Sequence, residues 1–200
     1  MPMRPPADSP LPPSTPEATA PLPPAPSVFL VGLPGAGKST LGRQLARRLG
    51  LTFVDTDHVI EARLGCPIRE FFEREGEAPF RDLEASVLDE LASRPGIVLS
   101  TGGGAVLRPA NRQVLRQRGW VVYLKSQPNE LFRRLRHDTT RPLLQVDDPL
   151  KALKALFATR DPLYRATAHH VVETGRPSVS SLVHQIAMQW EQLALQQGQG

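Results

Sequence analysis

Short apolar runs alternate with longer amphipathic stretches from residue 27 to residue 197. The apolar runs predict five strands, at residues 28–31, 52–54, 97–99, 121–124 and 169–172. Apolar positions at helical spacing predict helices at residues 38–49, 57–64, 68–75, 79–93, 109–118, 128–136, 149–164 and 179–197. Strands that alternate with helices in this way are typical of an α/β fold, in which helices cover both faces of a parallel sheet.

Residues 1–26 depart from this pattern. They hold 11 of the 21 prolines and no aromatic residue. Such a segment buries too little apolar surface to offset the entropy lost on ordering, so we expect a disordered tail with local polyproline-II structure. The remaining residues, 27–197, are predicted to form a single domain, which is long enough for one hydrophobic core.

Composition and charge narrow the class of protein. The 200 residues are 40% hydrophobic, and no apolar run approaches the ~18–20 residues of a membrane span. The single cysteine excludes a disulfide framework. The N-terminus lacks the basic and apolar regions of a secretory signal, so a cytoplasmic location is expected. Net charge is only +4, and the arginines are spread along the chain, which favours a small anionic ligand over nucleic acid.

A glycine-rich segment lies between the first predicted strand and the first predicted helix. Residues 32–40 read Gly-Leu-Pro-Gly-Ala-Gly-Lys-Ser-Thr, which is the complete P-loop pattern. Its backbone N–H groups and the helix N-terminus cradle phosphate oxygens, while Lys38 reaches the β and γ phosphates and Ser39 ligates Mg²⁺. The residues expected to bind ATP here are Gly35, Ala36, Gly37, Lys38, Ser39 and Thr40, the last in a supporting role.

Polar residues follow the second and third predicted strands. Asp55 and Asp57 are two apart in an extended chain and therefore face one space, where one can hold Mg²⁺ through water and the other can accept a hydroxyl proton. Alternatively, one of them caps the following helix. Residues 101–104, Thr-Gly-Gly-Gly, bring backbone close to a ligand or form a tight turn. No Asp closes the third strand, which leaves Ser100 to meet the metal's water shell.

These motifs together resemble the shikimate kinase family. The segments that carry the resemblance, all in the family's order, are residues 32–40, 53–57, 80–84, 101–106, 141–144 and 160–164. The resemblance implies a P-loop kinase fold: a three-layer α/β/α sandwich with a five-stranded parallel sheet in the order 2-3-1-4-5. It also implies transfer of the γ-phosphoryl group of MgATP to the 3-hydroxyl of shikimate, on the way to chorismate and the aromatic amino acids.

The resemblance implies roles for individual residues as well. Asp57 matches the acid that meets the substrate hydroxyl, and Asp55 matches the metal-associated acid beside Ser39. The positions that match catalytic residues are Lys38, Asp57 and Arg141. Those that match substrate-binding residues are Asp57, Arg81, Gly102, Gly103, Gly104 and Arg160, with Glu84 orienting the arginines. Those that match ATP-binding residues outside the P-loop are Arg134, Arg141 and Arg176.

The residues themselves support some of these roles and leave others open. Arg81 and Glu84 are three apart on one predicted helix and are therefore neighbours, although Arg81 can equally form a surface ion pair with Glu84 or Glu77. Arg165 is as available to an anion as Arg160. The arginines that crowd one helix end, any of which can meet ATP, are Arg133, Arg134 and Arg136.

Residues 137–148 are polar and rich in turn formers, and they predict a lid that excludes water and brings Arg141 to the phosphoryl group. A kinase of another small hydroxy acid, such as gluconate, would share the P-loop and the size. A non-catalytic ligand sensor is a further alternative. The expected partners are shikimate and ATP, without nucleic acid or membrane, and a monomer is expected because no long exposed apolar face is evident.

Overall fold

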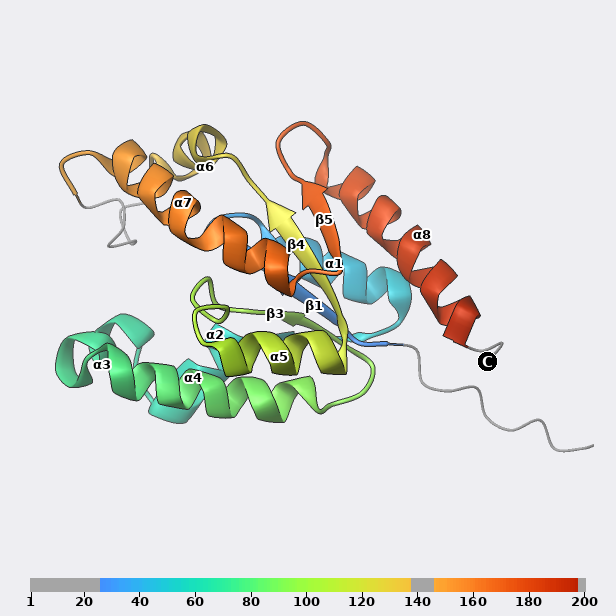
Figure 1. The fold of residues 1–200 in the computed structure, drawn as a ribbon, viewed down its shortest axis with the longest axis horizontal. Coiled ribbons are helices and arrows are strands. Elements are labelled where there is room, and N and C mark those ends of the chain that lie inside the picture. The colour runs from blue at the N-terminus through green and yellow to red at the C-terminus, as the bar shows by residue number, and fades with distance from the viewer. Residues whose placement is uncertain (1–25, 138–145, 198–200) are drawn as a thin grey trace, which may run out of the picture.

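Five strands form one parallel sheet in the computed structural model, which describes residues 26–137 and 146–197. The strands are β1 (Val28–Val31), β2 (Thr52–Asp55), β3 (Ile97–Ser100), β4 (Trp120–Lys125) and β5 (His170–Glu173). Their order in the sheet is β2-β3-β1-β4-β5 (Figure 1). Val28 of the central strand pairs with Val98 on one side and with Trp120 on the other. The strand order that the family resemblance implied is therefore confirmed.

The described residues also form eight helices. They are α1 (Lys38–Leu49), α2 (Thr56–Leu64), α3 (Ile68–Glu75), α4 (Glu77–Ala92), α5 (Pro109–Arg118), α6 (Pro128–Leu135), α7 (Pro149–Thr167) and α8 (Val179–Gln197). Each lies within three residues of its predicted limits. The prediction succeeds because apolar spacing decides which face of each element is buried, and that spacing differs between helices and strands.

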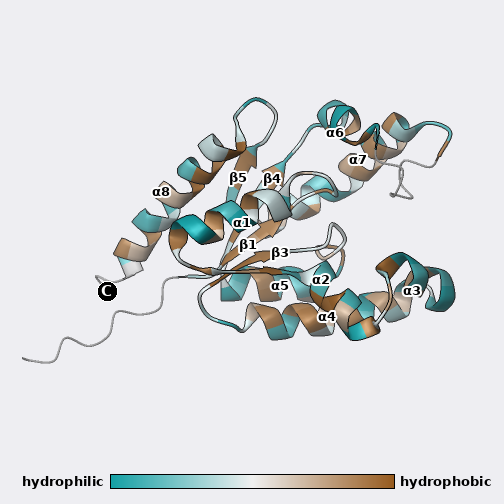
Figure 2. Cartoon of the chain, turned by 180° about the vertical axis from the view of Figure 1, so that it is seen from behind, coloured by the Kyte–Doolittle hydropathy of each residue, from teal (hydrophilic) through white to brown (hydrophobic). Residues whose placement is uncertain are grey.

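The sheet separates two hydrophobic clusters and so makes three layers. On β1, Phe29 and Val31 face one cluster, to which α4, α5 and α7 contribute. Val28 and Leu30 face the other, which is covered by α1 and α8. Figure 1 shows the side of α5 and α7, and Figure 2 shows the side of α1 and α8, where apolar strands lie behind helices with polar outer faces. Because alternate strand residues point to opposite faces, a strand buried on both faces is apolar along most of its length, as β1 is throughout.

Local chemistry sets the helix limits. Gly50 ends α1 in the left-handed conformation, with φ of 68°. Proline occupies the first turn of α5, α6 and α7, as expected for a residue that lacks an N–H group. Pro67 lies one position earlier relative to its helix, as the N-cap of α3.

Parts of the predicted tail and lid lie outside the described residues. They are residues 1–25 of the tail and residues 138–145 of the lid, which include Arg141. At the described end of the predicted lid, the Asp148 carboxylate accepts a hydrogen bond from the Lys151 N–H at 3.0 Å and caps α7. Within residues 26–137 and 146–197, no helix combines the length and apolar character needed to cross a membrane.

Candidate active site

A cavity of about 360 Å³ opens at the carboxyl ends of β1, β2 and β3. Ligands bind at this edge in open parallel sheets because loops and helix N-termini converge there. Ser100, Thr101 and Leu135 contribute to the wall. The predicted site residues that the structure brings together in this wall are Gly35, Gly37, Lys38, Ser39, Thr40, Asp55, Asp57 and Gly103.

The P-loop forms the floor on the α1 side of the cavity. Gly37 is the N-cap of α1 with φ of 92°, a conformation that favours glycine. The first N–H groups of the helix have no partner within it, and the residues that carry them line the cavity. The buried Lys38 ammonium donates hydrogen bonds to the carbonyl oxygens of Gly32 at 2.7 Å and Leu33 at 2.9 Å. The loop is therefore closed on itself by its own lysine, with the positive charge held at the cavity wall.

Ser39 and Asp55 meet on the same wall. The Ser39 hydroxyl donates to Oδ2 of Asp55 at 2.6 Å. The Ser100 hydroxyl lies 3.4 Å from the Ser39 hydroxyl. Oδ1 of Asp55 accepts the Asp57 N–H at 3.0 Å and caps α2. The helix-capping alternative is therefore confirmed for Asp55 through Oδ1, while Oδ2 of the same carboxylate faces Ser39.

The donor set suits a magnesium ion. Hydroxyl and carboxylate oxygens are the ligands that Mg²⁺ prefers, and this ion keeps several waters and substrate phosphates rather than a full protein cage. Ser39 and Asp55 supply two such oxygens beside the P-loop. The described residues contain no group of three or more His, Cys, Asp or Glu side chains placed to hold a metal.

Asp57 is the second residue of α2, not the end of an extended strand. The expectation that Asp55 and Asp57 share one face of a strand is therefore wrong in its geometry, because β2 ends at Asp55 and the helix begins directly. Both side chains nevertheless line the cavity. Desolvation of the carboxyl by the surrounding protein, followed by the charge of Asp55, raises the pKa of Asp57 from 3.8 to about 6. Lys38 opposes this shift. The residue as a whole nevertheless remains exposed at the cavity. A carboxyl with this pKa can accept a proton near neutrality.

A buried ion pair lies beside Asp57. The Arg81 guanidinium donates to the Glu84 carboxylate at 2.7 Å and to Glu77 at 3.2 Å. The Glu84 side chain is only 3% exposed, whereas that of Glu77 is 63% exposed. Both ion pairs that the sequence left open are therefore present, and the buried partner, Glu84, holds the guanidinium in place. The same guanidinium lies over the Phe80 ring, 5.2 Å from its centroid.

The glycine loop after β3 packs against these charged groups. A side chain on Gly102 would meet the Asp57 and Glu84 carboxylates, and one on Gly104 would collide with the Arg81 guanidinium. The backbone thus approaches both acids and the arginine as closely as only glycine permits.

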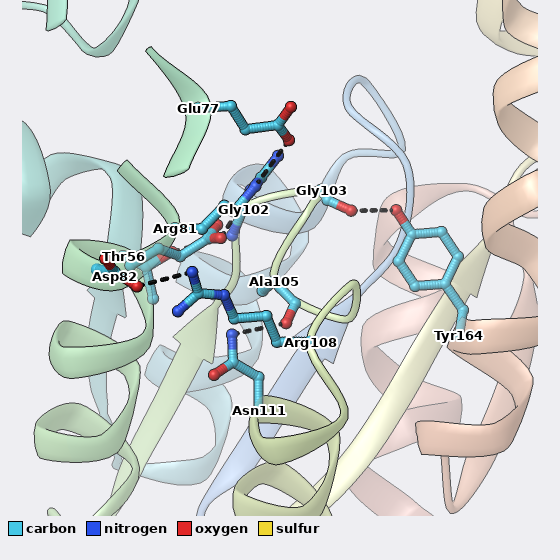
Figure 3. Close-up of polar contacts among 11 residues, drawn as sticks. Thr56, Glu77, Arg81, Asp82, Gly102, Gly103, Ala105, Arg108, Asn111 and Tyr164 are labelled. Carbon is cyan, nitrogen blue, oxygen red and sulfur yellow. Dashed lines mark hydrogen bonds and ion pairs between the residues drawn. The ribbon is translucent and has the colours of Figure 1, made fainter. Parts of the chain in front are cut away.

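Side chains from three helices hold this loop, and sequence reasoning did not assign them a role (Figure 3). The Thr56 hydroxyl accepts the Gly102 N–H at 2.9 Å, and the Tyr164 hydroxyl donates to the Gly103 carbonyl at 2.6 Å. The Asn111 amide donates to the Ala105 carbonyl at 3.0 Å. Thr56 stands between two candidate acids, and Tyr164 lies one turn beyond a candidate arginine, so proximity in sequence was the available signal for these two.

The remaining predicted arginines lie in different surroundings. Arg165 forms an ion pair with Asp161 at 2.8 Å, which distinguishes it from the half-buried Arg160. Arg134 donates to the Thr174 carbonyl at 2.7 Å and so contacts the segment after β5. Arg176 is exposed in that segment.

The fold and this cavity together define a P-loop kinase of a small molecule. The model of the family described as shikimate kinase matches residues 34–191. The chain belongs to the shikimate kinase family.

Individual relatives agree with this family assignment. A curated shikimate kinase of Paracidovorax citrulli is 61% identical over 168 residues, which cover 82% of this chain and 92% of the relative. The solved structure of a shikimate kinase from Acinetobacter baumannii in complex with shikimate is 46% identical, with a TM-score of 0.79 over 84% of this chain and 93% of that one. A gluconokinase from Sinorhizobium meliloti matches with a TM-score of 0.58 over 86% of this chain and 95% of its own, but only 22% identity, which demonstrates a shared fold alone.

Proposed function

We propose that this enzyme transfers the γ-phosphoryl group of MgATP to the 3-hydroxyl of shikimate, giving shikimate 3-phosphate and ADP. One observation carries the proposal. A carboxyl with a pKa of about 6 and a buried Arg–Glu pair face one glycine loop next to the P-loop. A substrate that carries both a hydroxyl and a carboxylate can bind to both features. Its hydroxyl would meet Asp57, and its carboxylate would meet Arg81 and Arg160.

The reaction needs positioning and charge stabilisation more than covalent chemistry. Asp57 holds the acceptor hydroxyl and takes its proton as the oxygen forms a bond to the γ phosphorus. The bond from that phosphorus to the bridging oxygen breaks, and the electron pair leaves with ADP. Lys38 and the N–H groups at the start of α1 stabilise charge on the phosphate oxygens.

A magnesium ion, when bound at Ser39 and Asp55, would neutralise negative charge on the phosphates. Ser39 and Asp55 are suited to that role by their oxygens and by their place beside the P-loop. Thr40 completes the proposed ATP site, together with Arg134, Arg176 and, outside the described residues, Arg141. We further propose that the enzyme is a cytoplasmic monomer. Sedimentation equilibrium would test the oligomeric state.

The test is ADP production by the purified chain with MgATP and shikimate, with MgATP and gluconate, and without acceptor. Turnover with shikimate alone is the expected result. Turnover with gluconate would favour the alternative hydroxy-acid kinase. Binding of ATP or shikimate without turnover on either acceptor would favour a non-catalytic sensor and overturn the proposal.

A further inference from the structure

Tyr164 connects two parts of the site that are distant in sequence. Its side chain is fully buried, and its hydroxyl donates to the Gly103 carbonyl, 61 residues away, at 2.6 Å. Figure 3 shows the ring extending from its helix to the glycine loop. Tyr164 lies on α7 one turn beyond Arg160, so this hydrogen bond ties the loop to the helix that carries the second candidate arginine.

Gly103 is the middle residue of the loop whose backbone packs against Asp57, Glu84 and Arg81. On its other side, a side chain on Gly103 would collide with Pro34 of the P-loop. The loop at Gly103 is therefore confined between Pro34 and the Tyr164 hydroxyl. A shift of its carbonyl would move the glycines on both sides and change the space around the guanidinium and the carboxylates.

The Tyr164 hydroxyl is a dependable donor. Burial raises the pKa of Tyr164 to about 12, although the neighbouring Arg160 guanidinium opposes the shift, so the phenol keeps its proton at any pH used for assays. The charges of Glu84 and Arg81 act on the same phenol. Arg81 and Arg160, which we propose bind the acceptor carboxylate, are thus close enough to act electrostatically on Tyr164.

We propose that Tyr164 is a positioning residue that sets the glycine loop and Arg160 at the distance required for binding the acceptor carboxylate. It does so through the hydrogen bond to Gly103, and Tyr164 does not line the cavity beside the P-loop. This inference rests on the proposed function of the same site.

A matched pair of variants tests it. Tyr164→Phe removes the hydroxyl and keeps the ring, which packs on the Tyr123 ring at a centroid distance of 4.9 Å. Tyr123→Phe is the control, because Tyr123 is equally buried and its hydroxyl makes one hydrogen bond, to Asp161 at 2.9 Å, rather than to the loop. We expect Asp161 to keep its ion pair with Arg165 in that control, because the substitution does not touch either residue.

We expect Tyr164→Phe to raise the KM for shikimate by about 5- to 20-fold. Without the hydrogen bond the glycine loop occupies its binding position less often, and losing one such bond shifts an equilibrium by about this factor. The KM for ATP should stay within about twofold of the wild-type value, because weaker binding of shikimate does not change the contacts of the nucleotide. Tyr123→Phe should leave both KM values near those of the wild type. Its melting temperature should fall by about as much as that of Tyr164→Phe. Equal effects of the two variants on the KM for shikimate, or an equal rise of both KM values in Tyr164→Phe, would overturn the inference.

The wild-type assay separates this outcome from failure of the proposed function. If the wild type phosphorylates only gluconate, or nothing, the proposed function fails and so does this inference about the shikimate carboxylate. If the wild type turns over shikimate and Tyr164→Phe behaves like Tyr123→Phe, only the inference fails. Calorimetric titration of each variant with shikimate alone gives a second measurement, in which Tyr164→Phe is expected to bind more weakly by the same factor.

Discussion

The two sides of the cavity are built in different ways. The nucleotide side, residues 32–40, is one continuous segment whose lysine bonds to carbonyls of its own loop. The proposed acceptor side combines Asp57 and Gly103 of the cavity wall with residues packed beside it, and together these come from three helices and a loop. The residues beside the wall are Arg81, Glu84, Gly102, Gly104 and Arg160. Its contacts cross between elements, as in the hydrogen bond from α7 to Gly103.

This difference explains why a P-loop is easy to recognise and an acceptor site is not. Phosphates are bound by backbone N–H groups, so a short sequence that allows the right backbone conformation is sufficient. A particular acceptor is recognised by side chains whose distances depend on packing of the whole domain. The comparison also predicts that changes on the acceptor side alter the kinetics of shikimate and leave those of ATP unchanged.

The largest expected effect is that of Asp57→Asn. The amide cannot take the hydroxyl proton, so kcat should fall by about 10²- to 10⁴-fold. The KM for shikimate should change much less, because an amide can still meet the hydroxyl. Steady-state kinetics with each substrate varied in turn would measure both effects, and a kcat close to that of the wild type would exclude Asp57 as the base.

Arg81→Ala should have the next largest effect, and on KM rather than kcat. Removing a buried guanidinium takes away a bidentate carboxylate contact and leaves Glu84 unpaired, so the KM for shikimate should rise by about 10- to 100-fold. Arg165→Ala is the control, since Arg165 is exposed and pairs with Asp161. A similar rise in both variants would mean that the effect is not specific to the proposed carboxylate site.

The pH dependence sharpens the assignment of the base. The pKa of Asp57 is raised to about 6, so the ionised form that accepts a proton predominates above pH 6 and is lost below it. We expect kcat/KM for shikimate to level off above pH 6 and to fall by about tenfold per pH unit below it. The residual activity of Asp57→Asn should lack this step, and the same step in that variant would assign it to another group.

The smallest effect is expected from Gly104→Ala. The added methyl group would displace the Arg81 guanidinium, which can move because it ends a flexible side chain. The KM for shikimate should therefore rise by about 3- to 10-fold, less than in Arg81→Ala. Combining the two substitutions tests the mechanism, because Gly104→Ala should add little once Arg81 is absent.

Sequence reasoning reached different depths in the fold and in the site. All five strands and the described helices were predicted, because burial of apolar faces is periodic and local. The two acids were expected near the same cavity, but through an extended chain, whereas Asp57 is helical. That error arises because the strand ends and the helix begins at adjacent residues, where Asp55 itself caps the helix.

The sequence by itself determined the α/β fold, the P-loop and the family, since each depends on local pattern or on motifs in a given order. Only the tertiary structure decided that Glu84, rather than Glu77, is the buried partner of Arg81. It also decided that Arg165 is paired and that Tyr164 reaches Gly103. Burial and contact between distant segments follow from the packing of helices on the sheet, and spacing along the chain does not contain them.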